Sequence, residues 1–205
     1  MDNRISFTSN INFVSERNLR RIVFNNRSEY IPFEQPYYTC QFIKKSKNFF
    51  TNQIKTCTAG GLTDGKNNAV GFHILDSIKN FENIENIQKQ IFDMLASNPI
   101  SGILIGSKDL PNRHFSIPIF ENMTEFMKKS VPDLSIFKQH NLSNGESHIH
   151  YDVKTDTWNI CTKLFNKEKE CYYSASSVED IKKAYESIEI APNDKLLING
   201  KEVCM

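Results

Sequence analysis

The sequence predicts an α+β protein: a layered, sandwich-like arrangement of mostly antiparallel β-sheet with helices packed on its outside. Three observations carry this prediction. Segments of strand length, rich in Val, Ile, Phe and Tyr, recur between clusters of turn-forming residues. Two segments inside this series have apolar residues at helical spacing instead. Strands on both sides of two internal helices are typical of an antiparallel sheet that helices cover.

The first strands are expected in the N-terminal half of the chain. Residues 37–43, 49–59 and 69–75 have strand composition. Residues 63–68, Thr-Asp-Gly-Lys-Asn-Asn, form the densest group of turn formers in the sequence. We therefore expect residues 49–59 and 69–75 to pair as a hairpin around this turn.

Two helices and a buried strand follow the hairpin. The apolar residues of 84–96 fall on one helical face, and so do those of a second segment that begins at Ser116 and runs to residue 129. Between them, residues 102–106 form a short apolar run that suits a buried strand. The sequence then predicts strands over residues 134–139 and 148–153, with residues 158–164 returning as their partner.

The two ends of the chain are interpreted as extensions of a core that spans residues 37–165. Residues 1–36 alternate loosely, which predicts short strands and a turn or short helix at residues 15–21. Residues 166–205 contain Ser176 and Glu179 in capping-box spacing, which predicts a helix. An Asn-Gly pair at residues 199–200 then predicts a hairpin.

Length and composition narrow the class of protein. A chain of 205 residues suits one folded core, and a net charge of +1 creates no field that attracts nucleic acid. The absence of a run of about 18 apolar residues predicts no membrane span, and the polar N-terminus predicts no Sec signal. The five scattered cysteines form no Cys-x-x-Cys pair, which indicates a reducing compartment without a zinc ribbon or a disulfide framework.

One cysteine and one histidine stand out because of their positions in the expected hairpin. Residues that face each other in an antiparallel pair are equally far from the centre of the turn, and the midpoint between Cys57 and His73 is Gly65. A hairpin centred there places the two side chains opposite each other, with Cβ atoms roughly 5 Å apart. A buried structural pair explains the same spacing, and a register slip of one residue would separate the two faces.

The chemistry of this pair indicates a thiol hydrolase. An imidazole beside a thiol takes its proton during attack on a carbonyl and returns it to the leaving amine. Backbone amides in residues 58–61, Thr-Ala-Gly-Gly, are expected to stabilise the oxyanion. A third group is expected to orient the imidazole. Such a site needs neither a cofactor nor a metal.

The order of elements and three residues of the core resemble the CheD family of chemoreceptor glutamine deamidases. That family shares its fold with the catalytic domain of cytotoxic necrotizing factor and with Burkholderia lethal factor. Its pattern is a threonine, a cysteine that closes a Leu-Gly-Ser-Cys motif, and a histidine in a following strand. This sequence has Thr51, then Ile-Lys-Thr-Cys ending at Cys57, then Gly-Phe-His ending at His73. The resemblance covers residues 37–165.

The resemblance implies a CheD-like fold and a function. Cys57 would be the nucleophile, His73 the general base and Thr51 the group that hydrogen-bonds the imidazole. A straight strand of six residues spans about 20 Å, so Thr51 reaches His73 only if the chain bends between Thr51 and Cys57. Lys55 replaces the glycine of the family motif, and the interval from Cys57 to His73 is one residue shorter than usual there. Both departures argue against chemoreceptors as the substrate.

The sequence therefore predicts an enzyme that converts a glutamine of a partner protein to glutamate through a Cys57 thioacyl intermediate. An effector or toxin is one interpretation, either cytoplasmic or delivered by a non-Sec route into the cytoplasm of a host cell. Transglutamination would occur instead if an amine outcompeted water. The target protein and the oligomeric state are not predicted.

Three alternatives remain open from the residues. A non-catalytic interaction module could retain the fold. A papain-like peptidase would place the cysteine at the N-terminus of a helix, which the β-type pattern around Cys57 disfavours. His148 and His150 share one face of a predicted strand and could bind zinc with His114 or His140 as a third ligand, although an exposed strand face is the favoured interpretation.

Overall fold

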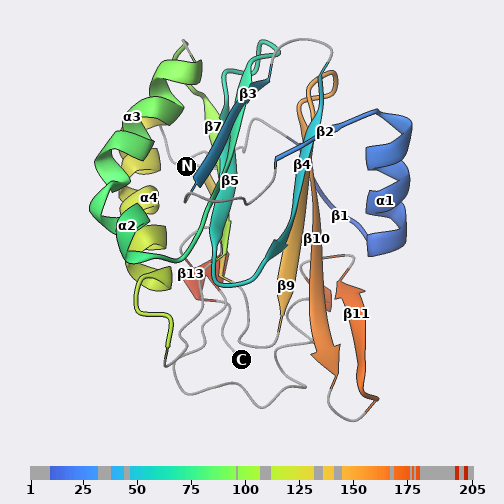
Figure 1. The fold of residues 1–205 in the computed structure, drawn as a ribbon. Coiled ribbons are helices and arrows are strands. Elements are labelled where there is room, and N and C mark those ends of the chain that lie inside the picture. Colours follow the sequence, from blue (N-terminus) through green and yellow to red (C-terminus); the bar gives the residue numbers. More distant parts are fainter. Residues whose placement is uncertain are drawn as a thin grey trace, which may run out of the picture.

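The computed structural model describes residues 10–31, 38–43, 47–95, 97–106, 112–131, 136–140, 145–166, 169–175, 177, 179–180, 197–198 and 201–202. Two β-sheets pack face to face, and helices lie against the outer side of each (Figure 1). Most pairings between the described strands are antiparallel. The predicted layered α+β class is confirmed.

The first sheet, sheet A, has six strands in the order β1-β10-β9-β4-β2, with β11 also paired to β10. The pairs β1–β10 and β2–β4 are parallel. The strands are β1 (Asn10–Phe13), β2 (Glu29–Tyr30), β4 (Phe49–Ile54), β9 (Glu146–Asp152), β10 (Thr157–Asn166) and β11 (Cys171–Ala175).

The second sheet, sheet B, has seven strands in the order β13-β12-β8-β7-β5-β6-β3. Only the β7–β8 pair is parallel among those described here. The strands are β3 (Tyr38–Ile43), β5 (Thr58–Thr63), β6 (Ala69–Ile74), β7 (Ser101–Gly106), β8 (Ile136–His140), β12 (Leu197–Ile198) and β13 (Lys201–Glu202).

The helices cover the outer faces of the two sheets (Figure 1). Helix α1 (Glu16–Asn25) lies over sheet A, and its N-terminus is capped by the Ser15 side chain, which accepts from the Asn18 N–H. Helices α2 (Ile78–Glu82), α3 (Ile84–Leu95) and α4 (Ser116–Ser130) lie over sheet B. The predicted helices at residues 84–96 and 116–129 are thus confirmed.

Two hydrophobic layers hold these elements together. Apolar side chains of β5, β6 and β7 pack against α3 and α4 in the first layer, which includes Phe72 of β6 and Ile87 of α3. The second layer fills the space between the sheets, where Phe49, Tyr151 and Trp158 of sheet A form a cluster of aromatic rings. Burial of such large rings contributes strongly to packing one sheet on the other.

The predicted strand over residues 49–59 is wrong, because this segment forms two strands in different sheets. Strand β4 ends at Ile54 in sheet A and β5 begins at Thr58 in sheet B. Gln53 has a φ of 56°, and the register of β4 against β9 shifts between Thr51 and Ile54. This bulge turns the chain so that residues 55–57 cross from one sheet to the other.

The hairpin is present, but its register differs from the predicted one by two residues. Ala59, and not Cys57, lies opposite His73, and the last pair before the loop is Thr63 with Ala69. The loop therefore has residues 64–68 and is centred on residue 66. The carboxylate of Asp64 explains this length, because its Oδ1 accepts from the N–H groups of Lys66 at 2.7 Å and Asn68 at 3.1 Å.

Segments from both chain ends contribute strands to the two sheets. β1 and β2 pair with β10 and β4, and the predicted C-terminal hairpin is confirmed as β12 and β13, which join sheet B beside β8. β8, predicted as a partner of residues 158–164, pairs in parallel with β7 instead. Most of the predicted C-terminal helix lies outside the described residues; within it, the Asp180 N–H donates to Ser177 Oγ at 3.0 Å.

Candidate active site

Cys57 lies at the open end of the β5–β6 hairpin, in the bend that joins the two sheets. It is 8% exposed, so a small part of the residue reaches the surface. Because it precedes a strand and not a helix, the papain-like arrangement is excluded. The predicted direct opposition of Cys57 and His73 is also wrong. Cys57 stands two residues before the partner of His73, on the diagonal of the hairpin end.

His73 is fully buried and its ring points into the space between the sheets. Its Nδ1 lies 2.6 Å from Oγ1 of Thr51, which belongs to the opposite sheet. The bulge after Thr51 and the crossing at residues 55–57 supply the bend that this contact requires. The structure therefore brings Thr51 and His73 together across the two sheets, with Cys57 at the end of the same hairpin.

The Thr51 hydroxyl determines which nitrogen of His73 carries the proton. Thr51 Oγ1 donates to the carbonyl oxygen of Ile31 at 3.0 Å. Its single proton is then engaged, so it accepts from the Nδ1–H of His73. In this tautomer Nε2 is unprotonated, as a general base requires. Burial lowers the pKa of His73 to about 4, so the ring is neutral near pH 7.

Replacing Thr51 by valine should destabilise the protein by about 2 kcal/mol, because the variant removes the acceptor for Nδ1–H and the donor for the Ile31 carbonyl in a buried place. Thr51→Ser keeps the hydroxyl and should stay within about 1 kcal/mol of the parent. Urea unfolding measures both, and nitrogen NMR of the imidazole reports the tautomer. Equal stability of the two variants would contradict the assigned hydrogen bonds.

The Cys57 sulfur is in an environment that favours the neutral thiol. Burial raises the pKa of the Cys57 thiol, and the carboxylate of Asp76 acts in the same direction. A hydrogen bond from the Asp76 backbone N–H and the charge of Arg113 oppose this rise. At rest, the Cys57 thiol and the His73 imidazole are therefore both neutral.

The bend that carries Cys57 is held by elements on both sides. Ser116, the first residue of α4, donates from Oγ to the carbonyl oxygen of Thr56 at 2.7 Å. Gly106 at the end of β7 lies so close that a Cβ there would be 1.9 Å from the carbonyl oxygen of Cys57. These contacts fix the backbone on either side of the thiol.

The expected oxyanion donors are not where the sequence placed them. Residues 58–61 lie within β5, which pairs with β6 on one side and β7 on the other. Amide groups in a strand paired on both sides donate to the neighbouring strands, so those of Gly60 and Gly61 are not available to a substrate. The bend at residues 55–57 is the remaining stretch of backbone beside the thiol.

The side chain of Lys55, which stands where the pattern of the resembled family has a glycine, reaches toward sheet A. Its Nζ lies 3.6 Å from Oε2 of Glu146, and its side chain is 56% exposed. Glu146 also pairs with Lys163 at 3.0 Å, and Lys163 reaches Glu16 of α1 at 3.2 Å. The lysine thus belongs to a chain of ion pairs that runs from α1 to the bend beside Cys57.

The two histidines of the alternative metal site lie beneath α1, so the favoured interpretation of an exposed strand face is wrong. His148 is 8% exposed and His150 is fully buried. His150 uses both ring nitrogens in hydrogen bonds, at 2.8 Å to Ser28 Oγ and at 3.1 Å to Asn159 Nδ2. His114 is exposed, and the side chain of His140 lies outside the described residues. Within the described ranges, no three His, Cys, Asp or Glu side chains gather in a way that could hold a metal ion.

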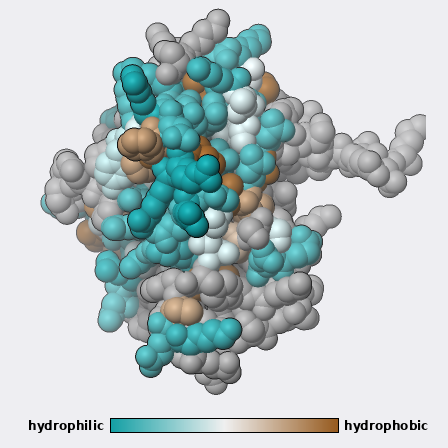
Figure 2. Space-filling model, turned by 90° about the vertical axis from the view of Figure 1, so that its right-hand side faces the viewer, coloured by the Kyte–Doolittle hydropathy of each residue, from teal (hydrophilic) through white to brown (hydrophobic). Residues whose placement is uncertain are grey.

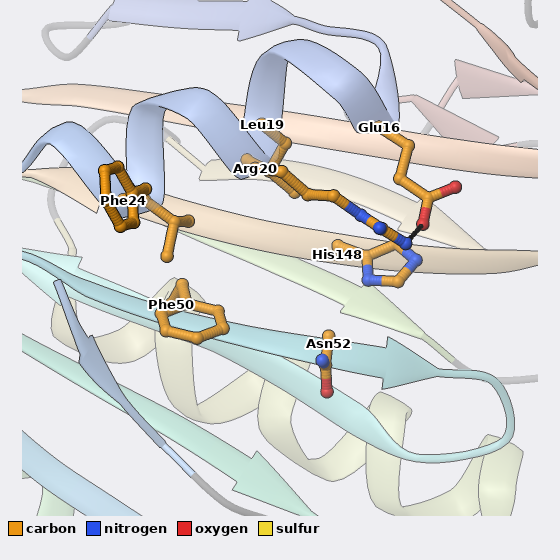
Figure 3. Close-up of a pocket in the computed structure, with 8 residues that line it drawn as sticks. Glu16, Leu19, Arg20, Phe24, Phe50, Asn52 and His148 are labelled. Atoms are coloured by element: carbon orange, nitrogen blue, oxygen red, sulfur yellow. Dashed lines mark hydrogen bonds and ion pairs between the residues drawn. The ribbon is translucent and has the colours of Figure 1, made fainter.

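His148 also lines a pocket of about 330 Å³ between α1 and the outer face of sheet A (Figure 3). Arg20, which pairs with Glu16 at 2.6 Å, and Phe24 extend from the helix, and Phe50 lies on the sheet below them. Figure 2 views this side of the molecule, where hydrophilic residues surround scattered apolar patches. Neighbouring residues of a strand point to opposite faces, so the pocket and the Thr51–His73 contact lie on opposite sides of β4.

The comparisons with known proteins assign no family to this chain. No protein-family model matches the sequence, and no curated protein matches it significantly. Of the helices described above, none is both long and apolar enough to cross a membrane. Sequence reasoning missed Asp76, Arg113 and Ser116 as neighbours of Cys57. The one available signal was the position of Asp76 two residues after the strand that carries His73.

Proposed function

We propose that the protein is a cofactor-free protein-glutamine deamidase in which Cys57 is the nucleophile, His73 the general base and Thr51 the group that orients the imidazole. The hydrogen bond between Thr51 Oγ1 and His73 Nδ1 carries this proposal. It links two sheets, holds a buried neutral imidazole in one tautomer and belongs to the hairpin at whose open end Cys57 stands. A structural histidine such as His150 is hydrogen-bonded as well, so His73 differs from it in belonging to the hairpin at whose end Cys57 stands.

The chemistry follows from the resting state. As the Cys57 sulfur attacks the side-chain carbonyl carbon of a glutamine, Nε2 of His73 takes the thiol proton. The tetrahedral intermediate then breaks its carbon–nitrogen bond, His73 returns the proton to nitrogen, and ammonia leaves. Water attacks the thioester while His73 takes a proton from it, and His73 returns this proton to sulfur as the carbon–sulfur bond breaks. The products are glutamate and the restored thiol.

A glutamine in a flexible segment of a partner protein is the substrate class that fits a thiol at the end of a hairpin. Cys57 is only 8% exposed, and we expect an extended segment to bring a side chain to such a thiol more readily than a folded surface does. An amine that replaces water would give transglutamination at the same thioester. Action as an effector or toxin on a host protein, in the cytoplasm of the producing or a recipient cell, belongs to this proposal.

A non-catalytic interaction module is the second candidate. The raised pKa of the Cys57 thiol and the loss of the expected oxyanion donors favour it. The two candidates differ in whether the Cys57 sulfur reacts with the help of His73, which can be measured without knowing the target.

The first measurement is alkylation of each cysteine by iodoacetamide at pH 8, read by peptide mass spectrometry, in the parent and in His73→Gln. If His73 acts as a base, Cys57 should react at least tenfold more slowly in the variant. The exposed Cys171 serves as the internal control and should react equally in both proteins. Equal rates at Cys57 in parent and variant would reject the proposed function and leave the interaction module.

The second measurement looks for substrates. Cell proteins incubated with the enzyme in oxygen-18 water should gain the label at specific glutamines, because water supplies the new carboxylate oxygen. Cys57→Ser should reduce this labelling by roughly a thousandfold. Label at the same glutamines with both proteins would show that Cys57 is not the nucleophile.

A further inference from the structure

Asp76 is a buried carboxylate that neither the predicted site nor the reaction steps above use. It follows β6 by two residues, and its side chain is only 3% exposed. The Phe115 N–H donates to the carboxylate. Arg113 Nε lies 3.9 Å from Oδ2, beyond hydrogen-bond distance, and no donor in the described part of the chain contacts this oxygen. An acceptor without a donor is costly in a buried place, so such an oxygen suggests a missing ligand.

This carboxylate lies next to the nucleophile. In the hairpin register, Thr58 faces Ile74, so residues 56 and 57 meet the chain that continues from β6 to Asp76. The Asp76 backbone N–H donates to the Cys57 sulfur. The first turn of α4 closes the same corner, since Ser116 binds the Thr56 carbonyl and Phe115 binds Asp76. The Cys57 sulfur therefore lies against the backbone of the same residue, Asp76, that carries the carboxylate.

We propose that Asp76 is the specificity-determining residue of the proposed reaction: its carboxylate accepts a hydrogen bond from the NH2 group of the bound glutamine. The inference rests on the proposed function. In an attack geometry the carbonyl carbon lies about 3 Å from the sulfur, which puts the amide nitrogen and an acceptor beyond it within about 6 Å. An ionised carboxylate only accepts, so it matches NH2 and rejects a carboxylate in the same position.

The same charge accounts for two further properties of the site. The glutamate product carries a carboxylate that Asp76 repels, which favours its release. The negative charge also helps to keep Cys57 protonated until a carboxamide occupies the corner. Burial raises the pKa of Asp76, and the charges of Arg113 and His114, both from the segment before α4, oppose this rise. No proton moves to Asp76, because His73 carries the proton in each step.

Two small alkylating reagents test the inference without a known substrate. Iodoacetamide carries a carboxamide, and iodoacetate carries a carboxylate of similar size. In the parent, the ratio of the two alkylation rates should be higher at Cys57 than at Cys171, which is exposed. In Asp76→Asn this ratio at Cys57 should fall about tenfold, the effect of one charge about 6 Å away in a partly screened site. Cys171 should show no change.

Two further variants separate a charge effect from a structural one. Arg113→Gln removes the opposing cation, whose side chain is 55% exposed, and should raise the ratio at Cys57. Asp93→Asn, an exposed residue of α3, makes the same charge change elsewhere and should leave the ratio unaltered. Opposite shifts in Asp76→Asn and Arg113→Gln are the expected result. If Asp76→Asn fails to fold, a higher ratio of the two rates at Cys57 in Arg113→Gln supports the inference, and an unchanged or lower ratio overturns it.

The outcomes distinguish this inference from the proposal on which it rests. If Cys57 reacts with the help of His73 but its preference for iodoacetamide is the same in the parent, Asp76→Asn and Arg113→Gln, the role of Asp76 is overturned and the deamidase proposal stands. If the reaction of Cys57 with iodoacetamide and with iodoacetate does not depend on His73, both the role of Asp76 and the deamidase proposal are overturned.

Discussion

Lowering the pH from 8 to 5 should reduce the free energy of unfolding by roughly 4 kcal/mol, because two buried histidines resist protonation in the folded state. Burial lowers the pKa of His73 and of His150 to about 4 from the usual 6.5. Between pH 6.5 and pH 4 the unfolded chain binds more protons than the folded one, so the free energy of unfolding decreases as the pH is lowered. Each histidine accounts for about 2 kcal/mol between pH 6.5 and 5.

The pH window identifies the responsible groups. Above pH 5 the carboxyl groups of an unfolded chain remain largely ionised, so they contribute little. Burial also lowers the pKa of His148, and this adds a loss of the same sign. Since small domains have a free energy of unfolding of about 5 to 15 kcal/mol in total, this loss is a quarter or more of the stability.

Urea unfolding at pH 8 and pH 5 measures the effect, with His150→Gln as the matched variant. Glutamine does not ionise, so the variant should lose about half of the pH dependence, or about 2 kcal/mol. Equal stability of the parent at the two pH values would contradict the assignment of both histidines as buried and neutral.

Replacing Gly106 by alanine should destabilise the protein by more than about 4 kcal/mol and displace Cys57. Gly106 has a φ of 140°, which a side chain rarely permits, and a Cβ would lie 1.9 Å from the Cys57 carbonyl oxygen. The obstacle is backbone on both sides, so no rotamer change can relieve it. Urea unfolding should show the loss, and the alkylation rate of Cys57 should change in whatever protein remains folded.

Gly65→Ala is the matched control. Gly65 also has a positive φ, of 67°, but the nearest atom to its Cβ is the end of the Ile100 side chain at 2.5 Å, which can move. The left-handed conformation then accounts for most of the loss, about 1 to 2 kcal/mol. If the two alanine variants lost the same stability, the contact between Gly106 and Cys57 would not constrain the bend.

Local patterns in the sequence were sufficient for much of the fold. The helical spacing of apolar residues located α3 and α4, and alternation with turn formers located most of the strands. Both signals depend on interactions within a few residues of chain. These two signals were enough to predict the layered α+β class, since that class follows from the order of the helices and strands.

Contacts between residues far apart in the sequence could not be predicted from such local patterns. The composition of residues 49–59 suits a strand throughout, so nothing in it marked the change of sheet at residues 55–57. The hairpin register was two residues out because Asp64 caps a longer loop than a turn centred on Gly65 would give. The burial of His148 and His150 depends on α1, which comes from more than 100 residues away.

In the candidate site, too, local spacing predicted some of the residues, whereas contacts between distant segments could not be predicted. Spacing suggested Cys57 and His73, but the residue actually opposite His73 is Ala59. Thr51 entered through the resemblance alone, and its contact with His73 is a packing contact between sheets. Asp76 was missed, because a carboxylate just beyond the end of a strand is normally solvated.

Because the chain crosses between the sheets at residues 55–57, the proposed activity depends on the packing of one sheet against the other. Thr51 is anchored in sheet A and His73 in sheet B, so each sheet can keep its internal hydrogen bonds while the imidazole loses its orienting partner. A folding intermediate, a pulling force or a binding partner that wedges the layers apart would therefore switch the chemistry off before it unravels either sheet. Thiol chemistry of this kind would be confined to the fully docked molecule.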